Sequence, residues 1–301
     1  MNLFTTMSAW IKDANEHNRT LAESMLAHEA WHTEVSEEQI LERMAGQLKV
    51  MEHSCEQGLA GVTSRAGLSG MDGKRLETYR TTKKTLMGPI ISKAVAYAVA
   101  INEVNAAMGV ICATPTAGSS GVMPAVLLTV RDELEMDEEA QLKFLVTTGG
   151  VGMMLANNAS ISGAGGGCQA EIGSATAMTA CALAEAMGGT PEQCGHAVAL
   201  ALKALLGLTC DPVAGLVEVP CIKRNGTAAA TAIVCAEMAM AGVVSKIPVD
   251  EVISAMGSIG RMMPVALKET ALGGLAQTDT AKQMTKELKE TGKISTGSVD
   301  A

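Results

Sequence analysis

The chain has 301 residues, enough for one large domain or two ordinary ones. Hydrophobic residues make up 48% of it but aromatic ones only 2%, so its core must be built from Ala, Met, Leu, Val and some of the 31 glycines. Such small side chains let helix backbones approach closely, which favours tightly packed helices. The net charge of −9 and the shortage of aromatic platforms exclude a surface built for nucleic acid or for an anionic membrane.

The N-terminus argues against export. Its sequence, MNLFTTMSAWIKDANEHN, carries early charges and no long apolar core, so it does not form a signal peptide. The eight cysteines are therefore expected to be reduced in the cytoplasm, where they are free to act as core fillers, nucleophiles or metal ligands.

Membrane insertion is also not expected. Two of the three most apolar segments approach spanning length, but each of the three contains an acid or a base. Because charges in lipid are costly, these segments are predicted to be buried helices. They are residues 172–189 with Glu185, residues 195–208 with Lys203, and residues 228–245 with Glu237.

Residues 1–85 form the most polar part of the chain and are predicted to be a mostly helical N-terminal region. The clearest start signal there is the capping box Ser36-Glu37-Glu38-Gln39, which predicts a helix running to about Val50. Residues 61–75, rich in Gly and Ser, are typical of a loop.

Residues 86–280 are predicted to form a helical catalytic core. An Ala-rich helical pattern runs from Pro89 to about Gly109, and a short extended stretch and another apolar run to about Leu134 follow it. The later predicted helices are one from the N-cap Asp137 toward Gly149, one from the Thr190 capping box to about Leu206, one from Thr227 to Val244, and one from the N-cap Asp250 through Met256.

The last residues, 281–301, are rich in Lys, Thr, Gly and Ser and are predicted to be a flexible tail. Few segments show the alternating pattern of a strand. The sequence therefore predicts an all-α fold, a tightly packed bundle of Ala- and Gly-rich helices whose functional residues lie in Gly-rich loops between them.

Three of the cysteines lie in breaks between the predicted helices. Cys168 follows three glycines, Cys210 precedes Asp-Pro, and Cys221 follows a proline. Such loops can aim several thiolates inward while backbone N–H groups point at sulfur, which suits a metal or iron–sulfur cluster. The spacings are not those of a zinc finger and leave simple burial open. Burial is the prediction for the other five, Cys55, Cys112, Cys181, Cys194 and Cys235.

The Gly-rich turn TPTAGSSGVMP is a second candidate, with hydroxyls at Thr116, Ser119 and Ser120 and flexible backbone at Ala117-Gly118. A turn of this kind feeding a helix N-terminus gathers N–H groups and favours a carboxylate, although an ordinary N-cap turn has the same composition.

The run Lys223-Arg224-Asn225 is a third candidate, because two cations directly after a cysteine could bind a substrate carboxylate. Taken alone, the same run is more typical of a solvated surface.

Several segments together resemble one known family. GGGCQAEIGSATAM (165–178), GLTCDPVAGLVEVPCIKRN (207–225) and TPTAGSSGVMPAVLL (114–128) resemble the α chain of bacterial iron–sulfur L-serine dehydratases, and SRAGLSGMDG (64–73) and EVNAAMG (103–109) fit that family too. The resemblance covers about residues 55–275. In this family three cysteines hold a [4Fe–4S] cluster with one open iron, and the ordered ligands fall on Cys168, Cys210 and Cys221.

The resemblance implies a lyase that needs no pyridoxal phosphate and converts L-serine to pyruvate and ammonia, with the open iron activating the serine hydroxyl. The residues expected to bind the substrate are Thr116, Ala117, Gly118, Ser119, Ser120, Lys223, Arg224 and Asn225. Lys223 is one candidate for the base that takes the α-proton; a hydroxyl or a histidine on another chain are the others.

The resemblance also implies a partner. The chain lacks the tail cysteine that caps the open iron in some single-chain relatives, so we expect no such self-blocking, and a separate β chain is expected to be needed. Three alternatives remain open at this point: a related lyase acting on cysteine or threonine, an iron or redox sensor, and a metal-free helical scaffold.

Overall fold

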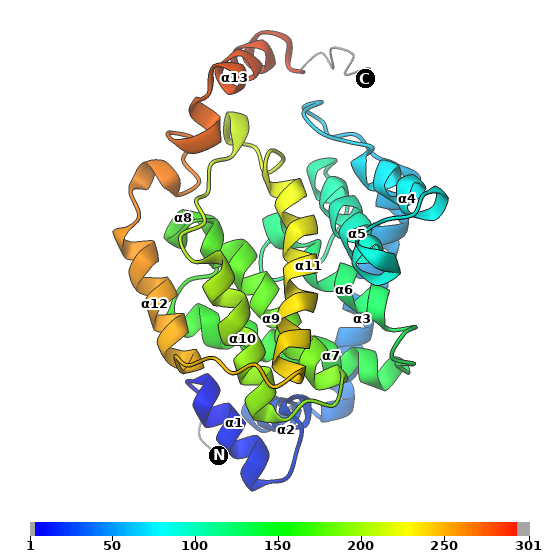
Figure 1. Cartoon of the computed structure of the whole chain (residues 1–301), viewed down its shortest axis with the longest axis vertical. Coiled ribbons are helices and arrows are strands. Elements are labelled where there is room, and N and C mark those ends of the chain that lie inside the picture. The colour runs from blue at the N-terminus through cyan, green and yellow to red at the C-terminus, as the bar shows by residue number, and fades with distance from the viewer. Residues whose placement is uncertain (1–3, 294–301) are drawn as a thin grey trace.

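Residues 4–293 are described by a computed structural model, and their regular structure is helical, which confirms the all-α prediction (Figure 1). The α-helices are α1 (Met7–Glu16), α2 (Leu21–Thr33), α3 (Glu37–Ala60), α4 (Asp72–Thr82), α5 (Gly88–Ala106), α6 (Val122–Val130), α7 (Glu138–Asn158), α8 (Gly163–Gly166), α9 (Ser174–Ala186), α10 (Pro191–Leu205), α11 (Cys221–Met240), α12 (Val249–Met262) and α13 (Asp279–Thr291). Shorter helices are η1 (Ala117–Ser119), the π-helical η2 (Gln169–Gly173), η3 (Val213–Gly215), η4 (Val265–Leu267) and η5 (Gly274–Gln277).

The core surrounds α9, which is buried from Ser174 to Ala184 and packs against α6, α7, α10 and α11. In Figure 1, α9 lies in the middle of the bundle with α10 and α11 in front of it. Its side chains are mostly Ala, Thr and Met, so neighbouring helices can pack close to its backbone. This packing explains how a chain with so few aromatic residues fills a large interior.

Glycines bring α3 and α4 into direct contact with α5. A Cβ atom added at Gly58 of α3 would lie 2.2 Å from the carbonyl oxygen of Ala100, and one added at Gly73 of α4 would lie 2.6 Å from the Cα of Ala100. The helices α3 and α4, from the predicted N-terminal region, therefore pack directly on α5, which belongs to the predicted core. The boundary between the two regions at residue 85 remains a prediction from the change in sequence composition.

The capping boxes at Ser36 and Thr190 and the N-cap at Asp137 begin α3, α10 and α7 as predicted. Two predicted helix ends are wrong, because both helices continue further along the chain. The helix α3 continues past Val50 to Ala60, and α7 continues past Gly149 to Asn158. At Gly150 a Cβ atom would lie 2.5 Å from the Trp10 ring, so the missing side chain makes room for α1.

Three other boundaries differ from the sequence pattern. The predicted loop 61–75 already contains the start of α4, and α11 begins at Cys221, six residues before Thr227. The helix α12 begins at Val249, and the Asp250 carboxylate instead accepts hydrogen bonds from the N–H groups of Met7 and Ser8, at 2.8 and 3.0 Å. Asp250 thus caps α1, a role that depends on tertiary packing.

The flexible tail predicted from residue 281 onward is corrected by α13, which occupies Asp279–Thr291. The Thr278 hydroxyl caps its first turn by accepting from Ala281 N at 3.3 Å, and Gly292 ends it in the left-handed conformation. Residues 294–301 of the predicted tail lie outside the described residues. No helix within residues 4–293 is both long and apolar enough to cross a membrane.

Candidate active site

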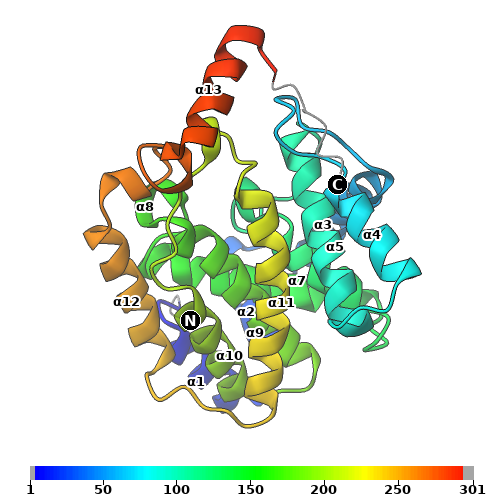
Figure 2. The ribbon, with the colours of Figure 1, turned by 45° about the horizontal axis from the view of Figure 1, so that its top comes forward.

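The segments singled out in the sequence meet at one end of the bundle. The N-terminus of α11, the turn containing η1, the π-helix η2 and the loop before η3 lie together there, beside the loop that leads into α4 (Figure 2). The contacts that join them are between side chains and backbone of residues far apart in the sequence. Hydrogen bonds and close packing hold each of these segments in place.

The three predicted ligand cysteines are all buried. Cys168 is 0% exposed and stands directly before η2, while Cys210 and Cys221 are each 2% exposed. The Sγ atoms of Cys168 and Cys210 and a carboxylate oxygen of Glu171 all lie within 4.8 Å of one another. Two thiols and a carboxyl group this close could hold a metal ion.

The protonation of the three thiols is linked. The hydrogen bond from Cys210 and the nearby Arg224 guanidinium lower the pKa of Cys168, although burial opposes them. The same hydrogen bond raises the pKa of Cys210. Burial and the negative charge at Cys168 raise the pKa of Cys221, which is not part of the group within 4.8 Å. A lowered pKa favours the thiolate form of Cys168, and thiolates are the form that binds metals.

A short parallel bridge holds the Cys210 loop in place. Cys210 N donates to the carbonyl of Leu267 at 2.9 Å, and Glu269 N donates back to the carbonyl of Cys210 at 3.0 Å. A Cβ atom at Gly163 would lie 2.9 Å from the Cys210 Sγ, so α8 also packs against this sulfur. Cys210 is therefore positioned by segments on both sides of it in the chain.

Glu171 is a site residue that the sequence reasoning missed. It is buried, its pKa is raised by that burial, and its Oε1 accepts a hydrogen bond from the Thr116 hydroxyl. Gly118 lies against it, because a Cβ atom there would be 2.6 Å from Glu171 Oε1. A lone acid three residues after Cys168, in a stretch otherwise made of small and apolar residues, is a signal that could have identified it.

The TAGSSG turn is held mainly through its backbone. The Asn102 side chain donates from Nδ2 to the carbonyls of Ala117 and Gly118, at 3.1 and 3.2 Å, and to the Ser120 hydroxyl at 3.2 Å. The Ser119 hydroxyl donates to the carbonyl of Thr114 at 3.1 Å. These bonds give the turn a fixed shape next to Glu171.

The three residues of the run Lys223-Arg224-Asn225 have three different environments. The Lys223 Nζ lies 2.6 Å from a carboxylate oxygen of Asp72 and the side chain is half exposed. Arg224 points inward, where it donates to the carbonyl of Thr209 and to Asp211 Oδ1, both at 2.9 Å. The two cations therefore lie on different sides of the first turn of α11.

Asn225 joins α11 to the TAGSSG turn. It is fully buried, donates from Nδ2 to the carbonyls of Gly118 and Cys221 at 2.8 and 2.9 Å, and accepts from Gly121 N at 2.9 Å. All of these bonds are to backbone groups. Asn225 thus fixes the distance between a predicted ligand cysteine and the predicted carboxylate-binding turn.

Two buried carboxylates hold the loop before α4 against the site. Glu218, from the cysteine loop, accepts from the Ser69 hydroxyl at 2.7 Å. Glu103, from α5, accepts from the first N–H groups of α4, those of Asp72 and Gly73, at 2.8 and 3.0 Å. Because Asp72 in turn pairs with Lys223, this predicted substrate-binding residue is connected to the core through α4. None of these three acids could be assigned from the sequence pattern.

Asn225→Ala is expected to lower the free energy of unfolding by about 2 kcal/mol, because it leaves buried backbone groups of Gly118, Gly121 and Cys221 without their partner. Thr227→Ala on the same helix is the matched control. Its hydroxyl bonds only the carbonyl of Arg224 at the surface, so a change within about 0.5 kcal/mol is expected. Urea unfolding of both variants measures the difference, and equal losses would contradict the bridging role of Asn225.

Comparison with known proteins shows which family the chain resembles over most of its length. A family model described as "Serine dehydratase alpha chain" matches residues 16–276. A protein of Bacillus subtilis (strain 168) named "Probable L-serine dehydratase, alpha chain" is 51% identical over 286 residues, which are 95% of each chain. The "L-serine dehydratase, alpha chain" of Peptoniphilus asaccharolyticus is 39% identical over 292 residues, 96% of this chain and 100% of that one. The "L-serine dehydratase 1" of Escherichia coli (strain K12) is 43% identical over 182 residues, 60% of this chain and 40% of that one.

Proposed function

Because the chain belongs to the serine dehydratase alpha chain family, we propose that it is the cofactor-bearing α subunit of an L-serine dehydratase. Such an enzyme is a lyase that converts L-serine to pyruvate and ammonia. The observation that carries the proposal is the meeting of two buried thiols and a buried carboxyl group within 4.8 Å, at the place where the predicted substrate-binding segments converge.

The donor set fits the [4Fe–4S] cluster implied by the family resemblance. The thiols of Cys168, Cys210 and Cys221 are all buried, those of Cys168 and Cys210 lie within 4.8 Å of each other, and thiolates are the ligands that such clusters take from proteins. When bound by these three residues, the cluster would supply a Lewis-acidic iron for the substrate hydroxyl. Arg224, beside Cys168, would offset the negative charge that collects on the sulfurs.

The residues around the thiols are suited to hold an amino-acid carboxylate. Gly118 and the hydroxyls at Thr116, Ser119 and Ser120 come from a turn whose shape is fixed by buried side chains. Arg224 offers a guanidinium on the cysteine side and Lys223 an ammonium on the outer side. Fixed donors of this kind orient a substrate before reaction.

Lys223 is the candidate within this chain for the base that takes the α-proton. To act in this way its Nζ would have to leave Asp72, which it contacts at 2.6 Å. The alternatives are a hydroxyl of the TAGSSG turn and a histidine supplied by another chain. The Asp72→Asn variant distinguishes these candidate bases, because it should alter the pH profile of the reaction only if Lys223 is the base.

We also propose a separate β chain as partner, because the matched relatives include proteins named as α chains. A cytoplasmic location is proposed from the reducing conditions that free thiols require. A lyase of the same build acting on cysteine or threonine is the alternative function. A redox sensor is less well supported, since the acidic chain brings no basic surface for a nucleic-acid partner.

Anaerobic assay of the α chain together with its β chain tests the proposal. We expect pyruvate to be released from L-serine much faster than from L-cysteine, and faster than 2-oxobutyrate from L-threonine. Iron and sulfide should be present in the active protein and should be lost, together with activity, on exposure to air. Equal turnover of cysteine and serine would contradict the substrate, and full activity without iron would contradict the cofactor.

A further inference from the structure

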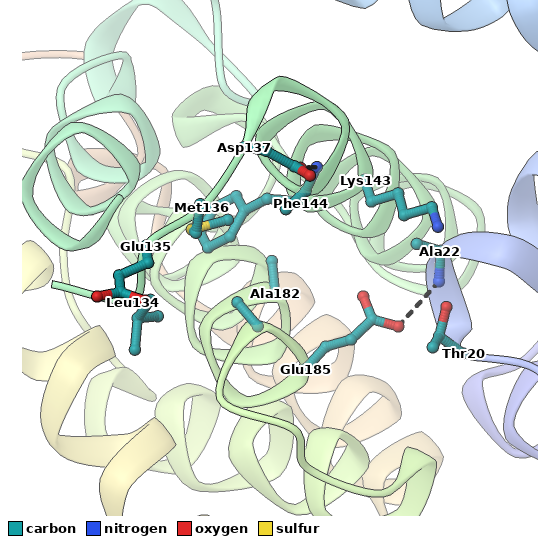
Figure 3. A pocket seen from close by; sticks show the side chains of 12 residues that line it. Thr20, Ala22, Leu134, Glu135, Met136, Asp137, Lys143, Phe144, Ala182 and Glu185 are labelled. Atoms are coloured by element: carbon teal, nitrogen blue, oxygen red, sulfur yellow. Dashed lines mark hydrogen bonds between the residues drawn. The ribbon is translucent and has the colours of Figure 1, made fainter. Parts of the chain in front are cut away.

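A pocket with charged groups in its wall lies at the end of α9 away from the cysteines. The helix α9 follows η2 without a break and is 13 residues long, about 20 Å, so its last turn is well separated from Cys168. There the end of α9, the beginnings of α2 and α7 and the turn before α7 enclose a pocket of about 280 Å³ (Figure 3). Pockets for drug-sized ligands measure about 300–1,000 Å³, so this one suits a smaller molecule.

The charged and apolar parts of the pocket wall are separated. Figure 3 shows the Glu185 carboxylate and the Lys143 ammonium at one end, both beside Ala22 of α2. Of the two other acids in the wall, Asp137 caps α7 and Glu135 is exposed. The rest of the wall is mainly apolar and includes Leu134, Met136, Ala140, Phe144, Ala182 and Ala186. A ligand that matches this wall carries its charges at one end and an aliphatic body at the other.

Glu185 is the one charged residue of α9 and stands in its last turn. Its carboxylate accepts a hydrogen bond from Ala22 N at 2.9 Å and another from the Thr147 hydroxyl. Burial raises the pKa of Glu185, while the hydrogen bonds from Thr147, Ala22 and Leu21 oppose the rise. A carboxylate has about four acceptor positions, so three bonds leave one for a ligand. An ammonium group is the partner that this remaining position favours.

Lys143 is the cation of the pocket wall. Its Nζ lies 3.0 Å from a carboxylate oxygen of Glu139 and 3.3 Å from one of Glu23. The hydrogen bonds to these two acids raise the pKa of Lys143 although burial opposes them, so the side chain stays charged. An ammonium group has three donors, and two of them are used by the acids. The third donor can bind a carboxylate.

We propose that this pocket binds a small α-amino acid with an aliphatic side chain. The ammonium of the amino acid binds Glu185, and its carboxylate binds Lys143. Its side chain lies against the apolar part of the wall, on Met136 and Phe144. A simple amine would leave the free donor of Lys143 unused, and a simple acid would bring a second negative charge to Glu185. The site is separate from the proposed serine site and does not depend on the proposed function.

Isothermal titration calorimetry of the full chain with three probes of one aliphatic body tests the site. L-Leucine carries both charged groups, 3-methylbutylamine lacks the carboxylate, and 4-methylpentanoate lacks the ammonium. We expect L-leucine to bind with a dissociation constant of about 1 mM, because a ligand with so few atoms gains only modest affinity. The amine should bind at least about fivefold more weakly and the acid at least about tenfold more weakly, since each loses a charge-assisted hydrogen bond.

Three variants locate the binding. Glu185→Gln keeps an acceptor for Ala22 N but removes the charge, so it should weaken L-leucine binding at least about tenfold. Ala186→Phe fills the pocket from the end of α9 without altering either charge, and it should abolish binding. Glu237→Gln removes an exposed acid of α11 and is the matched control, so it should leave the affinity unchanged. Circular dichroism checks that each variant is folded.

Lys143→Gln tests the amino-acid class, because it should reduce the affinity for L-leucine to that for the amine. A wild-type chain that binds L-leucine and the amine equally well would contradict the role of Lys143 and overturn this class of ligand. Absence of L-leucine binding to the wild-type chain would overturn the site itself. Binding that persists in Ala186→Phe would also overturn it, by placing L-leucine elsewhere on the chain.

Discussion

Cys168→Ser, Cys210→Ser and Cys221→Ser are each expected to abolish iron retention and to lower dehydratase activity by at least about 100-fold. All three thiols are buried, and the serine hydroxyl that would replace one is a much weaker iron ligand than a thiolate, so each substitution removes one of the ligands implied by the resemblance. Iron and sulfide content after anaerobic purification gives a readout that does not depend on catalysis. The reaction rate with L-serine in the presence of the β chain is the second measurement.

Cys181→Ala is the control for these variants. Cys181 is equally buried but lies inside α9 in the apolar core, so its removal should cost only about 1 kcal/mol of stability and should leave the iron content unchanged. Loss of iron in Cys181→Ala together with its retention in Cys221→Ser would show that the ligand set was chosen wrongly.

Gly58→Ala is expected to destabilise the protein by about 3 kcal/mol, one of the largest effects of a single methyl group in this chain. The added Cβ atom would lie 2.2 Å from the carbonyl oxygen of Ala100, and its three nearest atoms all belong to the Ala100 backbone, so no flexible side chain can move aside. The helices α3 and α5 would have to separate, and α5 carries Asn102 and Glu103, which hold the site loops. Urea unfolding measures the loss.

Gly46→Ala on the same helix is the control. Nothing lies within 4 Å of a Cβ atom at Gly46, and the position is exposed. Because alanine favours a helix more than glycine does, this variant should gain up to about 1 kcal/mol. A similar loss in both variants would mean that close packing against α5 is not what requires glycine at position 58.

The site depends on acids whose roles are visible only in three dimensions. Glu103 accepts from the first turn of α4, Glu218 from Ser69, and Glu171 from Thr116. Each connects two segments that are at least 30 residues apart in the chain. Removing one would shift a loop against the cysteines, so these acids act by positioning the residues that the sequence pattern singles out.

Local chemistry explains which sequence predictions were confirmed. The side-chain caps at Ser36, Asp137 and Thr190 act on N–H groups three residues away, so a short pattern was enough to find them. The predicted helix end near Gly149 and the predicted N-cap at Asp250 were wrong. The roles of Gly150 and Asp250 depend on distant partners, the Trp10 ring and the start of α1. A glycine that ends a helix and one that admits a neighbouring helix look the same in a sequence.

The amino-acid sequence by itself determined the helical class, several helix starts and the family, and it singled out three cysteines next to predicted helix ends. These features depend on composition, on contacts within a few residues and on motif identity. Only the tertiary structure decided that Glu171 joins Cys168 and Cys210, that Lys223 faces Asp72 while Arg224 faces the thiols, and that Asn225 connects two segments. Those arrangements follow from the close packing of helices, which brings together groups that are more than a hundred residues apart in some cases.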